Sequence, residues 1–227
     1  MNKLLITIAT PEISSVVEPF TQNHAEYAKA NGYEYRIDGL IWTHLHPSFS
    51  KVPAMERGLK EGWDWIVFAD ADCAFTNMRM DLKDVIESRL SEMPDLFAAG
   101  RQQLNWNAWK YICNGLLVIR NTPYAHKFFV RWADYCLNGT PNVVPGQRIF
   151  ITEHPFEQYS FDQLIRDTQY HGIYAATGAE IGCFCPEIWH DGEKWKPGMP
   201  TIHFAGPSSW ERRVEVFNRI YKDQVVR

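Results

Sequence analysis

The sequence predicts an α/β fold with a mostly parallel central sheet and helices on both faces. Short apolar runs of high β propensity alternate along the chain with helical patterns. The run Trp65–Ala69 is apolar throughout, as expected for a strand that is buried on both faces of a parallel sheet. No repeat, low-complexity tract or linker divides the chain, so we expect residues 1–227 to form one domain.

The first half of the chain alternates strands with helices. An apolar strand is expected at Leu4–Ala9, and the helix after it has a capping box of Ser15 and Glu18 and stops at Gly32. The other elements expected in this half are a strand at Tyr33–Ile37, a helix at Val52–Leu59, the strand at Trp65–Ala69 and a helix at Leu82–Leu90.

The second half continues this pattern. Thr122 caps a long helix whose first residue is Pro123. In sheets of this kind ligands bind beyond the carboxyl ends of the strands, so the residues there matter most. The other elements expected are strands at Leu96–Ala99, Leu116–Ile119, Ile173–Ala175 and Thr201–Phe204, a helix from about Phe161, and a closing helix with Val214, Phe217 and Tyr221.

Composition and charge exclude several classes of function. Hydrophobic residues make up 45% of the 227 residues and charged residues 22%, as in ordinary folded proteins. The net charge is −4 and no run of Lys or Arg occurs, so we expect no nucleic-acid partner. The aromatic content is 14%, with 9 Trp, which hints at a surface that stacks on sugar-like ligands.

The sequence predicts a soluble, cytoplasmic protein. The 5 cysteines are odd in number, and the close pair Cys183 and Cys185 lacks the second half of a zinc site, which favours reduced thiols. The apolar stretch at the N-terminus is too short for a signal peptide. No apolar run reaches the length of a membrane span.

Two aspartates follow the strand Trp65–Ala69 directly. Asp70 and Asp72 are separated by Ala71, and two carboxylates at a strand end can converge on one hard divalent cation that also holds a diphosphate. The alternative is a polar loop whose acids cap the next segment. The glycine-rich fingerprints of dinucleotide-binding and P-loop proteins are absent, which argues against both classes.

His203 follows a predicted strand near the C-terminus. Mn²⁺ accepts imidazole beside carboxylates more readily than Mg²⁺ does, so His203 is a candidate third ligand. Gly206 would let the backbone approach a phosphate, and the helix starting near Ser208 would direct its N-terminus at that anion. The alternative is a core histidine with satisfied hydrogen bonds.

Two further candidates have structural alternatives. Asp162 and Gln163 lie at a predicted helix start, where Ser160 and Gln163 also form an ordinary capping box and the helix dipole favours Asp162. Lys51 lies where a loop meets a helix. It either contacts a phosphate or substrate, or is a solvated lysine.

Several motifs in a fixed order carry a family resemblance. They are His46–Val52, Asp70–Asp72, Asn114–Asn121, Phe161–Gln163 and His203–Gly206. In this combination they resemble the metal-dependent glycosyltransferases of the GT-A fold. Within these they resemble the galactosyl/mannosyl/xylosyl transferase family of fungal Golgi galactosyltransferases and plant xyloglucan xylosyltransferases, with the glycogenin-like family as the nearest competitor.

The resemblance implies roles for single residues. Asp70, Asp72 and His203 would bind Mn²⁺ or another divalent cation, and the catalytic residues Asp162 and Gln163 would lie against the transferred sugar. The residues implied at the nucleotide-sugar are Ala9, Thr10, Lys51, Asp70, Ala71, Asn114, Gly115 and Gly206.

The resemblance also implies an activity. A sugar of the galactose, xylose or glucose class would pass with retention from a nucleoside diphosphate sugar, most simply a UDP-sugar, to an acceptor hydroxyl on a glycan. Attack on the same face, with a diphosphate oxygen taking the acceptor's proton, is favoured over a covalent intermediate. Each of Trp106, Trp109, Trp189 and Trp195 either stacks on acceptor sugars or packs in the protein.

The chain departs from these families in two respects. The segment Pro207-Ser208-Ser209 has neither the cysteine of the close family nor the phosphate-binding lysine of glycogenin-like relatives, which leaves the diphosphate contacts open. The membrane anchor and stem of the eukaryotic members are missing, which favours a soluble prokaryotic or viral relative.

Two other functional classes remain open. A phosphohydrolase of the haloacid dehalogenase type would use Asp70 as its nucleophile, although that motif normally opens the chain. A non-catalytic nucleotide-sugar-binding module would keep the fold, although such a module has no physical need for a complete metal shell.

Overall fold

The computed structural model describes residues 1–92, 97–106, 109–141, 147–149, 156–166, 172–188, 193–206 and 208–227, with the backbone alone at 102–106, 109–111, 156 and 220. That residues 1–227 form one domain stays a prediction.

The centre of the described structure is a 6-stranded sheet. Its strands are β1 (Lys3–Ile8), β2 (Glu34–Asp38), β3 (Trp65–Ala69), β5 (Ala98–Trp106), β6 (Trp109–Arg120) and β9 (Ile173–Ala176). They are hydrogen-bonded in the order β2-β1-β3-β6-β5-β9.

The sheet is mostly parallel, as the sequence predicts. β1 pairs in parallel with β2 and β3, and β5 pairs in parallel with β9. β6 runs antiparallel to its neighbours β3 and β5. The hairpin of β5 and β6 is longer than the short strands predicted at Leu96–Ala99 and Leu116–Ile119. All of β3 is buried, which explains its apolar sequence.

A smaller sheet beside the first was not predicted as a sheet. Its strands, in hydrogen-bonded order, are β10 (Cys183–Phe184), β11 (Thr201–His203) and β4 (Cys73–Phe75). β11 runs antiparallel to β4 and places His203 opposite Cys73. This register brings the C-terminal part of the chain to the turn that follows β3. A separate hairpin contains β7 (Thr140–Pro141) and β8 (Arg148–Ile149).

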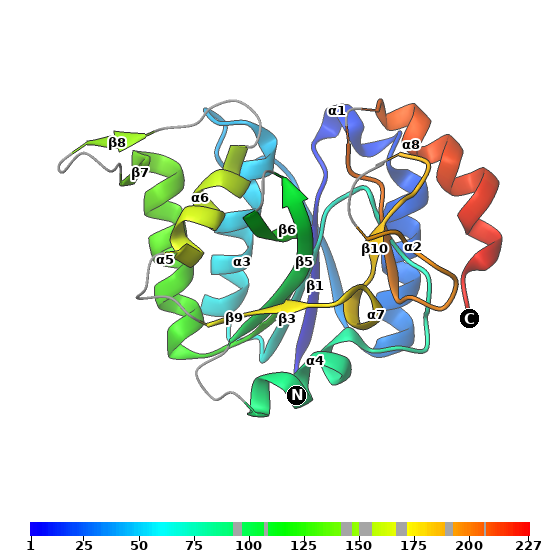
Figure 1. Cartoon of the computed structure of the whole chain (residues 1–227), viewed down its shortest axis with the longest axis horizontal. Coiled ribbons are helices and arrows are strands. Elements are labelled where there is room, and N and C mark those ends of the chain that lie inside the picture. Colours follow the sequence, from blue (N-terminus) through cyan, green and yellow to red (C-terminus); the bar gives the residue numbers. More distant parts are fainter. Residues whose placement is uncertain are drawn as a thin grey trace.

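Three α-helices cover one face of the large sheet (Figure 1). They are α3 (Lys51–Lys60), preceded by a 3-10 turn at Pro47–Ser50, α5 (Pro123–Asn138) and α6 (Phe156–Arg166). Met55, Phe128 and Phe161 from these helices pack in one core with Leu4 and Ile66 of the sheet.

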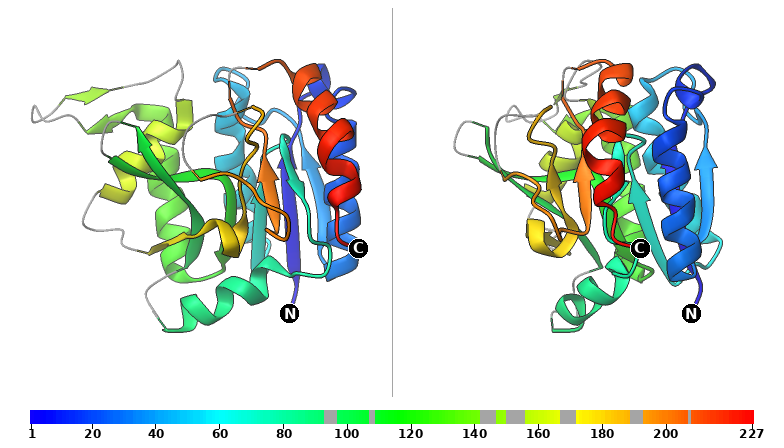
Figure 2. Two further views of the ribbon diagram at one scale, coloured as in Figure 1. Left: turned by 45° about the vertical axis from the view of Figure 1, so that its right-hand side comes forward. Right: turned by 90° about the vertical axis from the view of Figure 1, so that its right-hand side faces the viewer.

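The remaining helices lie over the other face and the smaller sheet. Tyr27 and Ile86 pack in one core with Leu5 of the large sheet. The rings of Phe20 and Phe217 are 5.0 Å apart, so the C-terminal helices lie beside α2, as both views of Figure 2 show. These helices are α1 (Pro11–Ser14), α2 (Glu18–Asn31), α4 (Leu82–Glu92), α7 (Gly178–Ile181) and α8 (Trp210–Val216), followed by a π-helical turn at Phe217–Tyr221 and a 3-10 turn at Lys222–Gln224.

The structure confirms some of the helix starts and stops that the sequence predicts. The Thr122 side chain accepts a backbone hydrogen bond at 3.1 Å and caps α5, as predicted. Gly32 ends α2 with a left-handed φ of 70°. The capping box of Ser15 and Glu18 is wrong, because α2 begins at Glu18 itself and its N-cap residue makes no side-chain cap.

The capping box predicted at Ser160 is also wrong. α6 begins at Phe156 instead of about Phe161, so Ser160 lies inside the helix. Its hydroxyl donates to the Glu157 carbonyl at 2.8 Å and accepts from Trp132 Nε1 at 3.2 Å. The Ser160 hydroxyl therefore makes a contact with α5 and does not cap a helix.

The cysteines Cys73, Cys113, Cys136, Cys183 and Cys185 are all free and buried. In the part of the chain that the structure describes, no helix has the length and apolar character needed to cross a membrane.

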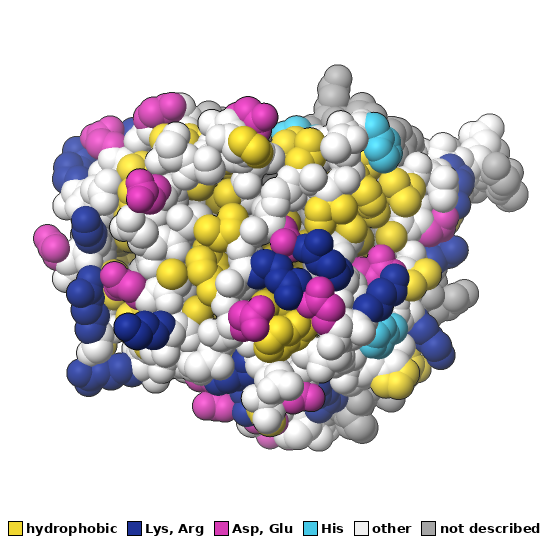
Figure 3. Space-filling model, turned by 180° about the vertical axis from the view of Figure 1, so that it is seen from behind, with side chains coloured by type: hydrophobic (Ala, Val, Ile, Leu, Met, Phe, Trp, Pro, Cys, Tyr) yellow, Lys and Arg dark blue, Asp and Glu magenta, His cyan; other side chains and the backbone are white. Residues whose placement is uncertain are grey.

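The aromatic surplus is partly used in the core. Trp65, Trp132 and Trp195 are buried, so at these positions packing and not ligand stacking accounts for the tryptophan. On the face seen from behind, acidic and basic side chains are interspersed, consistent with the small net charge of −4 (Figure 3).

Candidate functional site

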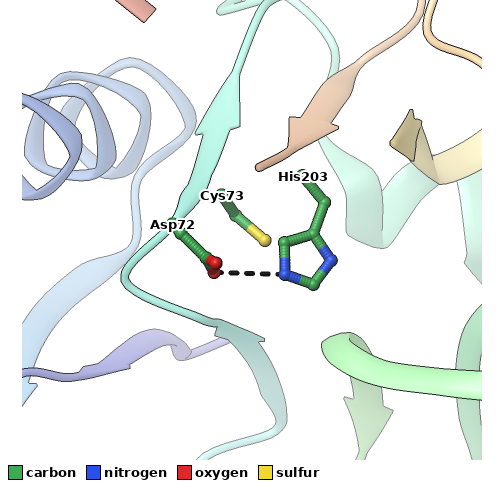
Figure 4. A group of neighbouring side chains, drawn as sticks. All are labelled: Asp72, Cys73 and His203. Atoms are coloured by element: carbon green, nitrogen blue, oxygen red, sulfur yellow. Dashed lines mark hydrogen bonds and ion pairs between the residues drawn. The ribbon is translucent and has the colours of Figure 1, made fainter. Parts of the chain in front are cut away.

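Three predicted metal ligands meet where the two sheets adjoin. Asp70 and Asp72 occupy the turn between β3 and β4, and His203 ends β11. His203 Nε2 lies 3.1 Å from Asp72 Oδ1 and 3.9 Å from Asp70 Oδ2. Figure 4 shows the imidazole and the Asp72 carboxylate facing each other, with the Cys73 sulfur beside them. The structure thus brings both carboxylates to one imidazole nitrogen.

Backbone hydrogen bonds hold this turn in place. The Asp70 N–H donates to the Gly115 carbonyl at 2.8 Å, and the Phe204 N–H donates to the Asp72 carbonyl at 2.8 Å. Gly115 also leaves room for the side chains, because a Cβ there would lie 2.4 Å from His203 Cε1 and 2.7 Å from Asp70 Oδ2. Only glycine fits against this pair without a shift of the site.

Lys51 is part of the site and not a solvated lysine. Its side chain is 2% exposed, and its Nζ lies 3.0 Å from Asp70 Oδ1 and 2.7 Å from Glu157 Oε1. It also donates to Asn114 Oδ1 at 3.3 Å. Burial alone would lower the pKa of Lys51, but the Asp70 and Glu157 carboxylates raise it above its ordinary range. We name Asp70, Asp72 and Glu157 the acidic cluster.

Two arginines lie close to the Asp72 and His203 side chains. Arg213 Nη1 lies 2.7 Å from Asp72 Oδ2. Arg101 is buried, with its Nη2 3.5 Å from His203 Nδ1 and its guanidinium 3.5 Å from the centre of the Phe184 ring. We name Lys51, Arg101 and Arg213 the basic cluster.

The pKa values of the three predicted ligands shift in different directions from their ordinary values. Burial raises the pKa of Asp70 despite the neighbouring Lys51 charge. Burial also opposes ionisation of Asp72, but His203 and Arg213 lower its pKa below the usual range. Burial disfavours the charged form of His203, yet Cys73 and Asp72 raise its pKa well above 6.5. Without a metal, the Asp72 carboxylate favours the protonated form of His203.

Asp162, which the sequence analysis places against the transferred sugar, lies on helix α6. Gln158 Nε2 donates to Asp162 Oδ1 at 2.9 Å and to the Ile112 carbonyl at 2.9 Å, and its Oε1 accepts from the Asn114 N–H at 3.0 Å. Asp162 is thereby tied through Gln158 to Asn114, which Lys51 contacts. Burial raises the pKa of Asp162 to about 7. Gln163 is half-buried on the same helix and makes no contact with this network within the described residues.

Ala9, Thr10 and Ala71 are buried at the carboxyl ends of β1 and β3, on the edge where the site lies. The Ala9 N–H donates to the Asp38 carbonyl at 2.9 Å, which ties this segment to the end of β2. The structure therefore places these three predicted nucleotide-site residues near one another.

Gly206 has a φ of 138°, and its carbonyl accepts from Arg213. The closing helix α8 begins at Trp210, and its N-cap is Ser209 instead of Ser208. Among the acceptor candidates, Trp106 and Trp109 face each other as backbone partners in the hairpin of β5 and β6, and their side chains are outside the description. Trp189 lies outside the described residues.

The residues present fit a divalent cation and an anionic ligand. Carboxylate oxygens and imidazole nitrogen are a donor set that Mn²⁺ accepts. Several buried polar atoms of residues that contact this site have no hydrogen-bond partner within the described part of the chain, so a ligand would find unpaired donors there. They are Nε and Nη1 of Arg101, Nδ2 of Asn114 and Nε of Arg213.

Sequence reasoning missed Glu157, Gln158, Arg101, Arg213 and Cys73. Gln158 lies one helical turn before Asp162, a signal that a correct start of α6 would have exposed. For Arg101 and Arg213 the sequence carries no signal, because each meets the site across more than 100 residues.

Comparison with known proteins agrees with the geometry. A model of the galactosyl transferase GMA12/MNN10 family matches residues 4–96, a segment that contains Lys51, Asp70 and Asp72. A sequence search of curated proteins gives no match.

Solved structures show the fold. The chain is similar to a glycosyltransferase involved in the glycosylation of the major capsid of PBCV-1, with a TM-score of 0.68 at 13% identity over 97% of this chain and 100% of that chain. It is similar to galactosyltransferase LgtC in complex with donor and acceptor sugar analogs (TM-score 0.54, 11% identity, 97% and 99% of the two chains). It is also similar to apo GlyE of Streptococcus pneumoniae TIGR4 (TM-score 0.57, 11% identity, 100% and 65%). The chain therefore has the GT-A fold of these glycosyltransferases, and its residues 4–96 resemble the galactosyl transferase GMA12/MNN10 family.

Proposed function

We propose that the protein is a metal-dependent, retaining glycosyltransferase that moves a sugar from a UDP-sugar to an acceptor hydroxyl on a glycan. The observation that carries this proposal is the meeting of Asp70, Asp72 and His203 beside the basic cluster. Galactose is the first candidate for the transferred sugar, since the family matched over residues 4–96 is described by galactosyl transfer. Xylose and glucose are the other candidates.

The charges at the site suit a diphosphate. The positive charges of the basic cluster balance the negative charges of the acidic cluster. A divalent cation would then leave an excess of positive charge that the doubly anionic diphosphate of a nucleotide-sugar neutralises. A neutral sugar alone would not need this excess.

Arg213 is our candidate for the diphosphate contact that glycogenin-like relatives make with a lysine. It reaches from the helix after Gly206, it is 14% exposed at the side chain, and its Nε has no partner within the described residues. An arginine can offer parallel N–H groups to a phosphate while another N–H stays on Asp72.

Different residues of the chain would have different roles in the reaction. Asp70, Asp72 and His203 would hold the cation, which when bound supplies Lewis-acid stabilisation of the departing diphosphate. Arg213 would add a fixed positive charge at the same group. The Asp162 carboxylate, ionised above pH of about 7, would stabilise positive charge developing on the transferred sugar.

Retention follows if the acceptor attacks from the face that the diphosphate leaves. A diphosphate oxygen then takes the proton of the acceptor hydroxyl, and no protein nucleophile is needed. Acceptor stacking on Trp106, Trp109 and Trp189, and a cytoplasmic location, stay predictions.

The test is a donor screen. The protein is incubated with Mn²⁺ and a panel of UDP-sugars, and free UDP is measured with and without candidate glycan acceptors. We expect turnover with one donor class and loss of at least about 100-fold in Asp72→Ala, because that change removes a ligand and leaves Arg213 unpaired. Proton NMR of the first product reads its anomeric configuration. Turnover that is equal in the variant, or an inverted product, contradicts the proposal.

The two competing classes predict other results. A haloacid dehalogenase-type phosphohydrolase would be trapped by beryllium fluoride at Asp70, but here that carboxylate is paired with Lys51 and follows a strand with an antiparallel neighbour. A non-catalytic module would bind UDP in calorimetry and release none from any donor.

A further inference from the structure

We propose that the Cys73 sulfur is a ligand in this metal site, so that the site also binds thiophilic divalent cations such as Zn²⁺ and Cd²⁺. The inference rests on the proposed function in one respect only, the use of Asp72 and His203 as metal ligands. It adds a sulfur donor to a site for which the sequence predicted oxygen and nitrogen donors alone.

Geometry is the first support. One ligand atom from each of Asp72, Cys73 and His203 lies within 4.8 Å of the other two (Figure 4). Ligand atoms around one zinc ion lie about 2.0–2.3 Å from the metal. Atoms this close together therefore need only short side-chain movements to share one ion.

The strand register explains why the sulfur faces this group. Cys73 and His203 are directly opposite each other in the antiparallel pair of β4 and β11, so their side chains share one face of the small sheet. The thiol is free, and it is buried with 1% exposure. Its Sγ lies 3.5 Å from the Gly115 carbonyl, whose residue lies against the His203 and Asp70 side chains.

An inert core cysteine is the alternative, since buried cysteine often behaves as a small apolar residue. Cys73 differs because a carboxylate and an imidazole share its surroundings. His203 presents Nε2 to Asp72, while its Nδ1 lies 3.8 Å from the sulfur of Cys113 and 3.5 Å from Arg101 Nη2. One ring nitrogen is thereby available to a metal and the other is engaged behind it, as is usual for metal-bound histidine.

Thiolate is a soft ligand and selects zinc-like ions over hard ones. When the ion binds, the Cys73 S–H bond breaks and a sulfur–metal bond forms. The thiol proton and the proton of the His203 nitrogen that becomes a ligand both pass to solvent. No group is oxidised or reduced. We expect Zn²⁺ and Cd²⁺ to compete with Mn²⁺ for Asp72 and His203.

The experiment is titration of the full chain with Cd²⁺ and Co²⁺, followed by ultraviolet absorption and by ¹¹³Cd NMR. We expect a sulfur-to-metal charge-transfer band and a ¹¹³Cd resonance in the range of sulfur ligation. In Cys73→Ser the band should vanish and Cd²⁺ affinity should fall by at least ~10-fold, with Mn²⁺ affinity much less affected. Thermal unfolding shows whether the variant folds. If Cys73→Ser does not fold, the ¹¹³Cd resonance of the wild type and the same titration of Cys73→Ala test the assignment instead.

Cys113→Ser is the matched control, because Cys113 lies on the other side of the same imidazole. It should keep the band. A band that is lost in Cys113→Ser and kept in Cys73→Ser overturns the assignment. Mn²⁺ and Cd²⁺ binding without any sulfur signature also overturns it but leaves the proposed function intact, whereas calorimetry that detects binding of neither ion contradicts both.

Discussion

His203 Nε2 lies 3.1 Å from Asp72 Oδ1, although 131 residues separate the two in the sequence. The contact exists because β11 pairs antiparallel with β4 immediately after the turn that carries both aspartates. The site therefore depends on the small sheet as much as on the large one. A change that separates β4 from β11 should remove all of the proposed metal binding at once.

Gly115→Ala should damage the site from a position that offers no ligand. The added Cβ would lie 2.4 Å from His203 Cε1 and 2.7 Å from Asp70 Oδ2. We expect activity to fall by about 100-fold, because a displacement of about 1 Å at reacting groups costs this much, and stability to fall by about 1–3 kcal/mol. Gly39→Ala is the control, since no atom lies within 4 Å of a Cβ there. Equal activity of the two variants would show that the space at Gly115 is unimportant.

Lys51→Met should destabilise the fold strongly. It removes the cation between the Asp70 and Glu157 carboxylates, and breaking a buried ion pair from one side costs about 3–5 kcal/mol. Urea unfolding measures the loss. Adding Glu157→Gln should recover part of it, because one uncompensated charge is then gone. No recovery in the double variant would mean that Lys51 acts by packing alone.

The rate of sugar transfer should rise with pH through about 7. Burial raises the pKa of Asp162 to about 7, so the carboxyl is neutral below this pH and cannot stabilise positive charge on the sugar. The pH dependence of kcat measures this, and Asp162→Asn should give a low rate without the same rise. A rate that falls between pH of about 6 and 8 has the opposite sign and rules out this role.

Gln158→Leu should move the midpoint of the pH dependence of kcat to higher pH. The Gln158 amide donates to Asp162 Oδ1 and favours the charged carboxyl. Arg166 also lowers the pKa and Cys113 raises it, and both remain in the variant. An unchanged midpoint would show that Gln158 supports the fold of α6 but does not tune Asp162.

Arg213→Met should weaken UDP binding by about 10- to 100-fold, the equivalent of a charge-assisted hydrogen bond of about 1.5–3 kcal/mol. Calorimetry with Mn²⁺ present measures the dissociation constant. Arg212→Met is the matched control on the same helix, because Arg212 pairs with Glu215 and is 43% exposed at the side chain. The proposal for Arg213 fails if both variants bind UDP as the wild type does.

Metal binding should release about one proton at neutral pH. The pKa of His203 is raised well above 6.5, so the metal-free ring is protonated and must lose its proton to become a ligand. Mn²⁺ affinity should accordingly fall as the pH is lowered. Calorimetry in two buffers of different ionisation enthalpy measures the release, and His203→Gln should abolish it. Binding with no proton release in the wild type would contradict a protonated metal-free His203.

The sequence predicted well those elements whose residues themselves have a clear pattern, such as an apolar strand or a helix cap. The all-apolar β3 and the Thr122 cap of α5 were predicted nearly residue for residue, because burial on both faces and a side-chain cap depend on neighbours in the chain. The start of α6 was misplaced, since Ser160 has the pattern of a cap but its hydroxyl is engaged by Trp132 of another helix.

The small sheet was not predicted because its strands are very short. A strand was expected at Thr201–Phe204, where β11 lies, but β4 and β10 contain only three and two residues, too few for an alternation of polar and apolar residues to be visible. β4 and β11 are also far apart in the sequence, so local patterns do not reveal that they pair.

The sequence by itself determined which chemical groups stand at the strand ends: Asp70 and Asp72 after an apolar strand, and His203 before a glycine. Tertiary structure alone decided their partners. It buried Lys51 between Asp70 and Glu157, and it set Arg213 against Asp72 across 141 residues. The reason is physical: residue type and local order fix which atoms can bind a cation, but the charges around them come from distant segments, and only packing determines which of those segments meet.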